Sequence, residues 1–152
     1  MCKDRERGTA MKSAFQEINH IFGQIESSYH DAAVKMHLSD SELWILYVLI
    51  TSDESKILQT ELIQITGIGK TTLNSALKKL EREEKVKLTP GKGRNICVSL
   101  TEKGNQLAQE TVCRLVDLEN QIYESWSPKD REVLIQLNRD YAQKLSEMVR
   151  SL

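Results

Sequence analysis

Apolar residues change their spacing between Leu58 and Leu100. Leu73, Leu77 and Leu80 recur at intervals of four and three, which is the period of one helix face. From residue 86 onward apolar and polar residues alternate, which is the period of a strand. The predicted elements are, in order, a helix over 60–66, a turn at Gly67, Ile68 and Gly69, a helix from Lys70, a strand over 86–89, a loop over 90–95 and a strand over 96–100.

Long amphipathic segments flank this stretch on both sides. A helix is predicted over 9–36, and its apolar residues form a narrow seam that suits a partner helix: Phe15, Ile18, Phe22, Ile25 and Tyr29. Residues 41–51 are apolar nearly all round, so we expect a central buried helix there, capped by Ser39 and Glu42. A minimal strand is predicted at Ile57 and Leu58. One long helix is predicted from Thr101 past Trp126, and a last helix begins at Ser127 and Pro128.

The order of these elements predicts the fold class. It is mainly α with a small β-hairpin wing, that is, a winged helix-turn-helix with long N- and C-terminal dimerisation helices. We interpret 1–152 as a single domain, in which 39–100 form a winged helix-turn-helix DNA-binding lobe. Segments 9–37 and 101–152 form a helical dimerisation region. These segments hold too much apolar surface for a module that folds alone, so a homodimer is expected.

Polar residues on the second helix of the lobe have the chemistry of a DNA-reading surface. Short hydrogen-bonding side chains near its start suit base edges in the major groove, and the cations that follow suit phosphates. The loop between the strands places two cations at an exposed tip that can enter a minor groove. The candidate DNA-binding residues are Lys70, Thr71, Thr72, Asn74, Ser75, Lys78 and Lys79 on the helix, and Lys92, Arg94 and Asn95 in the loop.

The charge distribution agrees with double-stranded DNA as the partner. Residues 69–95 contain eight lysines and arginines against three glutamates, a local charge of +5, although the whole chain has a net charge of −1. A basic island on an acidic body is typical of a nucleic-acid binder. The alternative is an ordinary solvated lysine-rich hairpin.

Enzymatic chemistry has little support in the sequence. Gly69, Lys70 and Thr71 look like the end of a phosphate-binding loop, but Gln64 stands where that pattern needs glycine. No paired carboxylates, nucleophile-base set or ligand cluster with suitable spacing is present, so no catalytic residue is assigned. We therefore expect a protein that is not an enzyme and that has no cofactor.

Cysteines and histidines do not form a recognisable metal site or disulfide framework. The three cysteines, Cys2, Cys97 and Cys113, have no short spacing among them, and nothing near Cys2 would activate its thiol. His20, His30 and His37 are ten and seven residues apart, so a metal ion would need ligands from other helices. No metal is expected.

No membrane or export signal is visible. The longest apolar run, Leu43 to Ile50, has 8 residues, far fewer than the roughly 20 that cross a bilayer. The charged N-terminus lacks a secretory signal, so a cytoplasmic location is expected and no membrane partner.

The chain resembles MarR-family transcriptional regulators over essentially its whole length. The resemblance is carried by Glu61-Leu62, Gly67-Ile68, Thr71-Thr72-Leu73, Leu77 to Glu81, Val86, Arg94 and Val98 to Gly104. It implies a homodimer that binds a pseudo-palindromic operator, usually as a repressor, and that a small molecule, metal or oxidant releases. A winged-helix adaptor that binds proteins instead of DNA is the alternative.

The resemblance also implies an effector pocket between the first helix, the helix after the wing and the DNA-binding lobe. Tyr29, His37, Trp44 and Tyr47 are the candidate lining residues, and the alternative is that these side chains only pack in the core.

Three positions depart from the family pattern. Lys92 replaces an acidic residue that usually supports the wing arginine, and Lys85 replaces a glycine after the recognition helix. Thr66 stands where leucine is common.

Overall fold

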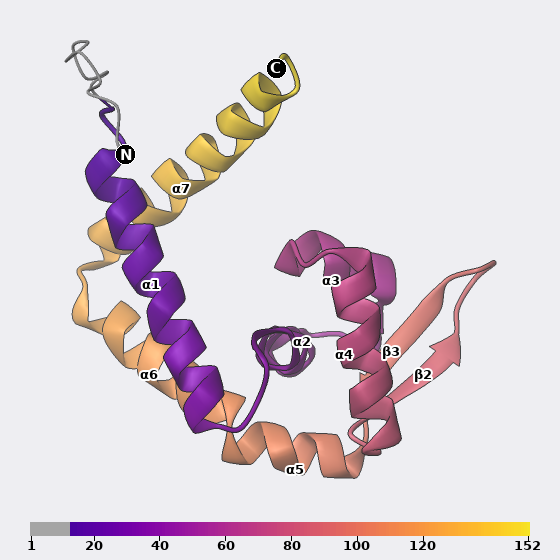
Figure 1. Cartoon of the computed structure of the whole chain (residues 1–152). Helices are drawn as coiled ribbons and strands as arrows, with labels where there is room; N and C mark the ends of the chain where they lie inside the picture. The colour runs from indigo at the N-terminus through magenta and orange to yellow at the C-terminus, as the bar shows by residue number, and fades with distance from the viewer. Residues whose placement is uncertain (1–12) are drawn as a thin grey trace, which may run out of the picture.

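The structure is a computed structural model that describes residues 13–152, and its elements confirm the predicted fold class (Figure 1). Most of this range is helical, and three short strands form one small sheet. In chain order the elements are α1 (Gln16–Lys35), α2 (Asp40–Thr51), β1 (Ile57–Leu58), α3 (Gln59–Thr66), α4 (Lys70–Arg82), β2 (Val86–Pro90), β3 (Ile96–Leu100), α5 (Glu102–Glu110), α6 (Val112–Ser125) and α7 (Pro128–Val149).

Helix α2 lies at the centre of the molecule and contributes to two cores, as its nearly uniform apolar sequence predicts (Figure 1). Ile45, Val48 and Leu49 face a core shared with α3, α4 and the sheet. Leu43 and Leu46 face a second core shared with α1, α5 and α6. A helix that is apolar all round needs this arrangement, because an amphipathic helix buries only one face.

The sheet confirms both predicted wing strands and the minimal strand at Ile57 and Leu58. Its order is β1-β3-β2, and both pairings are antiparallel. Val98 in the middle strand pairs with Ile57 on one side and Leu88 on the other, and its side chain is fully buried. The wing, formed by β2, β3 and their loop, projects from the end of the molecule away from α1 and α6 (Figure 1).

Helix α1 begins later than the predicted 9–36. Residues 9–12 lie outside the described range, and 13–15 precede the helix, which starts at Gln16. The end of the helix is close to the prediction, at Lys35.

The single long helix predicted after the wing is wrong, because the chain breaks at Thr111 into α5 and α6. Thr111 has φ −124° and ψ −92°, and its hydroxyl donates to the Leu107 carbonyl at 2.6 Å. A threonine side chain that bonds to the preceding turn competes with the helical backbone ladder and bends helices. The hydroxyls of Thr101 and Ser127 cap α5 and α7, and the Ser127 cap confirms the prediction at that position.

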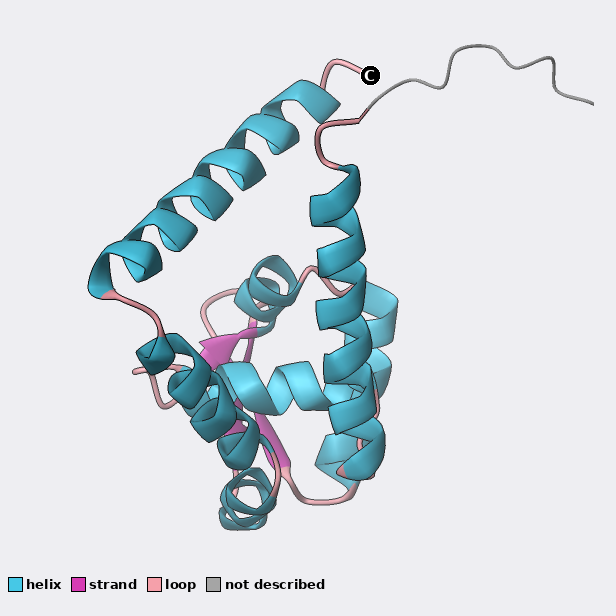
Figure 2. Cartoon of the chain, turned by 90° about the vertical axis from the view of Figure 1, so that its left-hand side faces the viewer, coloured by secondary structure: helices cyan, strands magenta, loops and turns pink. Residues whose placement is uncertain are grey.

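Helices α1, α6 and α7 leave apolar side chains at the surface, and we refer to them as the flanking helices. Helix α7 has no buried residue, and Leu137 on it is 64% exposed. Figure 2 shows α7 leaning away from the rest of the molecule towards the start of α1. There the Phe15 and Tyr141 rings stack with centroids 4.5 Å apart. The single chain therefore covers little of these apolar faces.

Candidate nucleic-acid interface

Helix α4 presents a polar stripe to solvent along its outer face. Leu73, Leu77 and Leu80 bury the opposite face in the core, which determines the face of the helix that points to solvent. The exposed residues farthest from that core follow spacings of four, three and four, and form what we call the outer stripe: Thr71, Ser75, Lys78 and Arg82. Arg82 was missed among the predicted site residues, although its spacing from Lys78 could have identified it.

Other predicted residues of α4 lie beside this stripe. Lys70 and Thr72 are exposed at the start of the helix. Asn74 is half-buried, and its side-chain oxygen accepts a hydrogen bond from the Gln59 amide on α3. Lys79 lies on the side facing α2, where its ammonium group pairs with a carboxylate oxygen of Glu42 at 2.9 Å. The structure thus separates Lys79 from its neighbour Lys78.

The wing loop is closed by backbone hydrogen bonds. The Gly91 N–H donates to the Asn95 carbonyl at 2.8 Å, and the Asn95 N–H donates to the Lys92 carbonyl at 3.3 Å. Gly93 has φ +66°, a left-handed conformation that glycine adopts without a side-chain clash. Lys92, Arg94 and Asn95 are all exposed, and within the described residues Arg94 forms no ion pair.

The connection from α4 to the wing uses a different left-handed residue from the one suggested by the family pattern. Glu84 has φ +57°, and Lys85 does not adopt a positive φ. Two backbone bonds complete this helix end: Glu84 N–H to Glu81 at 2.9 Å and Lys85 N–H to Leu80 at 2.8 Å. The Lys103 ammonium group pairs with the Glu84 carboxylate at 2.6 Å, which links the helix end to α5.

Three of the four candidate effector residues lie together at the junction of α1, α2 and α6. The Trp44 ring lies between the rings of Tyr29 and Tyr47, at centroid distances of 4.8 and 5.4 Å. Both tyrosine hydroxyls donate to the Glu119 carboxylate on α6, that of Tyr47 at 2.6 Å. Burial, together with this carboxylate, raises the pKa of both tyrosines. Glu119 was missed from sequence, although a carboxylate within the apolar stripe of α6 signals a buried partner.

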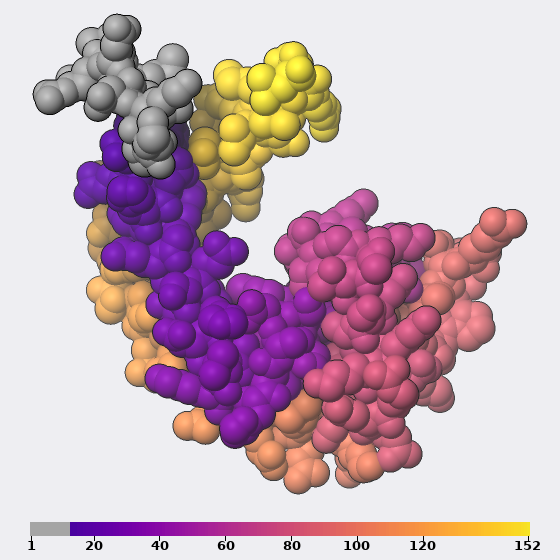
Figure 3. All heavy atoms as spheres, in the orientation of Figure 1, coloured from indigo at the N-terminus to yellow at the C-terminus, as the bar shows by residue number. Residues whose placement is uncertain are grey.

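His37 does not join this group. It is exposed at the end of α1 with φ +57°, and it lines neither of the two hollows that border α1. One hollow of about 580 Å³ lies between α1, α2 and the turn at Thr66 to Ile68, and the space-filling view shows the molecule hollowed on that side (Figure 3). The other, of about 680 Å³, lies between α1 and α6. Tyr29 lines both hollows, and Trp44 lines the first.

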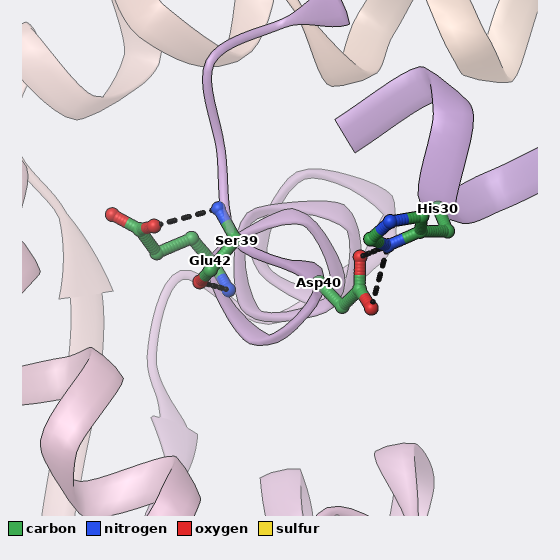
Figure 4. A network of polar contacts seen from close by, with 4 residues as sticks. All are labelled: His30, Ser39, Asp40 and Glu42. Atoms are coloured by element: carbon green, nitrogen blue, oxygen red, sulfur yellow. Dashed lines mark hydrogen bonds and ion pairs between the residues drawn. The ribbon is translucent and has the colours of Figure 1, made fainter. Parts of the chain in front are cut away.

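The first turn of α2 is held from two sides. The Ser39 hydroxyl accepts the Glu42 N–H at 3.1 Å, while the Glu42 carboxylate accepts the Ser39 N–H at 2.8 Å, which confirms the predicted cap. Asp40 lies on the opposite side of the turn from Glu42 and contacts His30 of α1 at 2.8 Å (Figure 4). This hydrogen bond, and the charge of Asp40, raise the pKa of His30.

The described residues contain neither a cluster of metal-ligating side chains nor a membrane-spanning helix. Between residues 13 and 152 no three His, Cys, Asp or Glu side chains gather closely enough to hold a metal ion. In the same range no helix is both long and apolar enough to span a bilayer. Cys97 and Cys113 are free thiols, and Cys2 lies outside the described residues.

The geometry above defines a class of architecture: a winged helix-turn-helix with an exposed polar helix face, a cationic wing tip and long flanking helices. No protein-family model and no curated protein matches the chain by sequence. Solved structures, in contrast, match nearly all of it. NMB1585, a MarR family regulator from Neisseria meningitidis, has 17% identity and a TM-score of 0.76, covering 92% of this chain and 98% of its own.

Two further structures extend the comparison. The M. tuberculosis transcriptional regulator MOSR, solved with DNA, has 21% identity and a TM-score of 0.59, with 87% of this chain and 98% of that chain covered. Bordetella bronchiseptica BpsR, whose DNA binding is regulated by 6-hydroxynicotinic acid, has 15% identity and a TM-score of 0.62, with 88% and 98% covered. The chain therefore has the fold of MarR-family transcriptional regulators.

Proposed function

We propose that this protein is a sequence-specific DNA-binding transcriptional regulator without enzymatic activity. One observation carries the proposal: the outer stripe of α4 and the cationic tip of the wing are both exposed at the same end of the molecule. Short polar side chains on the stripe suit base edges in a major groove, and Lys78 and Arg82 suit the phosphates beside it. Arg94 at the wing tip suits the neighbouring minor groove, helped by Lys92 and Asn95.

The remaining predicted contacts fit around this stripe. Lys70, Thr71 and Thr72 lie at the start of α4, the part of a recognition helix that approaches bases in other helix-turn-helix proteins. Asn74 and Ser75 follow within one turn. The Gln59 amide also donates a hydrogen bond to Asn74, so Asn74 has a structural partner besides the proposed contact with DNA. Lys79 is better explained by its pairing with Glu42.

Homodimerisation through the flanking helices is part of the proposal. Their exposed apolar residues include Ile18, Phe22, Leu118, Ile122 and Leu137. A twofold axis through this region would place two α4 helices on one duplex, with a spacing of about 34 Å needed to enter successive major grooves. A pseudo-palindromic operator follows from that twofold symmetry, and repression by steric block at such an operator is part of the proposal.

Release by a small-molecule effector is the last part of the proposal. The hollow of about 580 Å³ is lined by α1 residues and by the turn before α4, so an occupant would contact both the flanking helices and the winged lobe, residues 39–100. A ligand that favours one relative position of these two parts changes the population of DNA-competent dimers.

Selection from a random duplex library tests the function directly. We expect the recovered sites to contain two inverted half-sites one helical turn apart, and the affinity to fall steeply as salt rises. A protein that binds no duplex at any salt concentration, or whose affinity for duplex is independent of salt, would instead be the adaptor.

Substitution of the wing arginine tests its role in binding. Arg94→Ala should weaken operator binding by about 1 to 3 kcal/mol, because one minor-groove cation is lost. Arg139→Ala, on exposed α7 far from the wing, is the matched control and should leave affinity unchanged. A gel-shift series at fixed salt measures both, and full affinity in the Arg94 variant would remove the wing from the mechanism.

A further inference from the structure

Lys78 and Lys79 are adjacent in sequence but have different surroundings. Lys78 belongs to the outer stripe and forms no ion pair within the described residues. The Lys79 ammonium group reaches across to α2 and lies 2.9 Å from a carboxylate oxygen of Glu42. Because successive helical residues differ by about 100° in direction, two neighbouring lysines cannot both face a duplex in the same way.

The carboxylate of Glu42, the partner of Lys79, is buried and held in place by a second bond. The residue is only 2% exposed, and its second carboxylate oxygen accepts the Ser39 backbone N–H at 2.8 Å. Burial by itself would raise the pKa of Glu42, but the bonds from Ser39 and Lys79 lower it on balance. The carboxylate is therefore ionised in the folded protein and needs a cation close by.

The position of Glu42 allows this ion pair to restrain the orientation of α4. The capping hydrogen bonds fix Glu42 to the first turn of α2, the central helix that contributes to both cores. Lys79 lies in the C-terminal half of α4, about two and a half turns from its start. A hydrogen-bonded ion pair there restrains rotation of α4 about its axis and its tilt against α2, which apolar packing alone restrains less sharply.

We propose that Lys79 and Glu42 are positioning residues, which hold α4 in the pose that presents the outer stripe to base edges. The inference rests on the proposed function and assigns Lys79 a role different from that of Lys78. Lys78 attracts phosphates on any duplex, and Lys79 controls how well α4 discriminates between sequences. Glu42, which carries no charge attractive to DNA, then becomes a determinant of operator specificity.

Matched methionine variants separate the two roles, because methionine keeps the apolar stem and removes only the charge. For Lys78→Met we expect the slope of log affinity against log salt to fall by about one, with operator and random duplex weakened alike. For Lys79→Met we expect an unchanged slope and about a tenfold lower ratio of operator to random affinity. Its melting temperature should also fall by about 5 °C or more, because a buried carboxylate loses its partner.

A double variant distinguishes positioning from mere stability. Glu42→Gln keeps an oxygen that can accept the Ser39 N–H, so Glu42→Gln/Lys79→Met removes the ion pair without leaving an unpaired charge. We expect it to melt at a higher temperature than Lys79→Met alone, yet to keep the lowered specificity ratio. All binding is measured well below the lowest melting temperature, so that the fraction of folded protein is constant.

Four outcomes overturn the inference, and one of them also removes the proposed function. A salt slope lowered by about one in Lys79→Met, with no change in melting temperature, would make Lys79 an ordinary phosphate contact. A specificity ratio that returns to the native value in the double variant would reduce the pair to a stabilising contact. If the unaltered protein binds no duplex, the proposed function itself fails. If the unaltered protein binds its operator and Lys79→Met keeps the same ratio of operator to random affinity, only the positioning role is refuted.

Discussion

The winged lobe and the flanking helices bury their apolar residues to very different extents. In the lobe, α2, α3, α4 and the sheet enclose a core that includes the fully buried Leu62, Leu73 and Val98. Helix α7 has no fully buried residue, although its apolar residues recur with the same helical spacing as those of α4. Periodicity therefore identifies a face that must be covered, but it does not say whether the same chain covers it. The lobe has its partners within the chain, whereas the flanking helices leave apolar residues exposed in the single chain.

The largest effect is expected from a substitution that disrupts the contact between the lobe and α5. A Cβ atom on Gly104 would lie 1.9 Å from the Lys85 carbonyl oxygen, which already accepts the Thr101 N–H. Gly104→Ala should therefore lower the free energy of unfolding by about 3 kcal/mol. Gly23→Ala on α1 is the control: an added methyl meets nothing within 4 Å there, so a gain of about 0.5 to 1 kcal/mol is expected. Urea unfolding measures both, and equal effects would contradict the close approach.

A charge on the apolar face of α7 should weaken association through the flanking helices without disturbing the lobe. Leu137→Glu is expected to weaken dimerisation by about 2 to 3 kcal/mol, because the proposed dimer interface would receive a carboxylate in place of a leucine. The helical content should stay the same, since Leu137 is 64% exposed in the single chain. Sedimentation equilibrium and circular dichroism measure the two effects.

The control for that variant is Gln143→Glu, which adds the same charge on the polar side of α7. It should leave the association unchanged. An unaltered protein that sediments as a monomer would refute the dimer and remove the explanation for the exposed apolar faces.

A smaller effect is expected at the end of α4, where a substitution should stabilise the lobe. Glu84 adopts φ +57°, which costs a residue with a side chain more than it costs glycine. Glu84→Gly should raise the free energy of unfolding by about 0.5 to 1 kcal/mol, because the lost ion pair to Lys103 is exposed and contributes little. Lys103→Gln removes the ion pair alone and measures that contribution separately. A destabilised Glu84→Gly variant would mean that the ion pair outweighs the backbone conformation.

The smallest expected effect concerns the link between α1 and α2, where the two regions meet. The hydrogen bond to Asp40, and its charge, raise the pKa of His30 above the usual 6.5 in the folded state. The stabilisation is therefore fully present below about pH 6.5 and is lost as pH rises through the folded-state pKa. His30→Asn should accordingly cost more stability at about pH 5.5 than at about pH 8.5. Equal costs at both pH values, measured by thermal unfolding, would show that the imidazole charge is irrelevant.

Local interactions explain why much of the fold could be predicted from the sequence. Ser39 and Ser127 each cap a helix start at the expected residue, because a cap is completed within three residues. The alternating residues of the wing pair as expected, with Val86 opposite Leu100. The break at Thr111 was missed, because threonine also occurs inside helices and its competing hydrogen bond depends on how the chain packs around it.

The candidate site could be predicted only in part. Spacing alone placed Thr71, Ser75 and Lys78 on one exposed helix face, where the structure has them. Spacing did not reveal that Glu119 would receive two tyrosine hydroxyls, since those residues come from three helices far apart in the chain. Nor did spacing reveal that His37 would adopt a positive φ just after α1 and lie apart from the aromatic group.

What the sequence by itself determined is the set of elements, their order and the face that each must bury, because these depend on neighbours within a turn or two of the chain. The tertiary structure alone decided which distant groups meet. Lys78 and Lys79 are chemically identical, and only the packing of α4 against α2 brings one of them to Glu42 and leaves the other in solvent. A side chain's role depends on which charges surround it, and those charges are brought together only when the whole chain has folded.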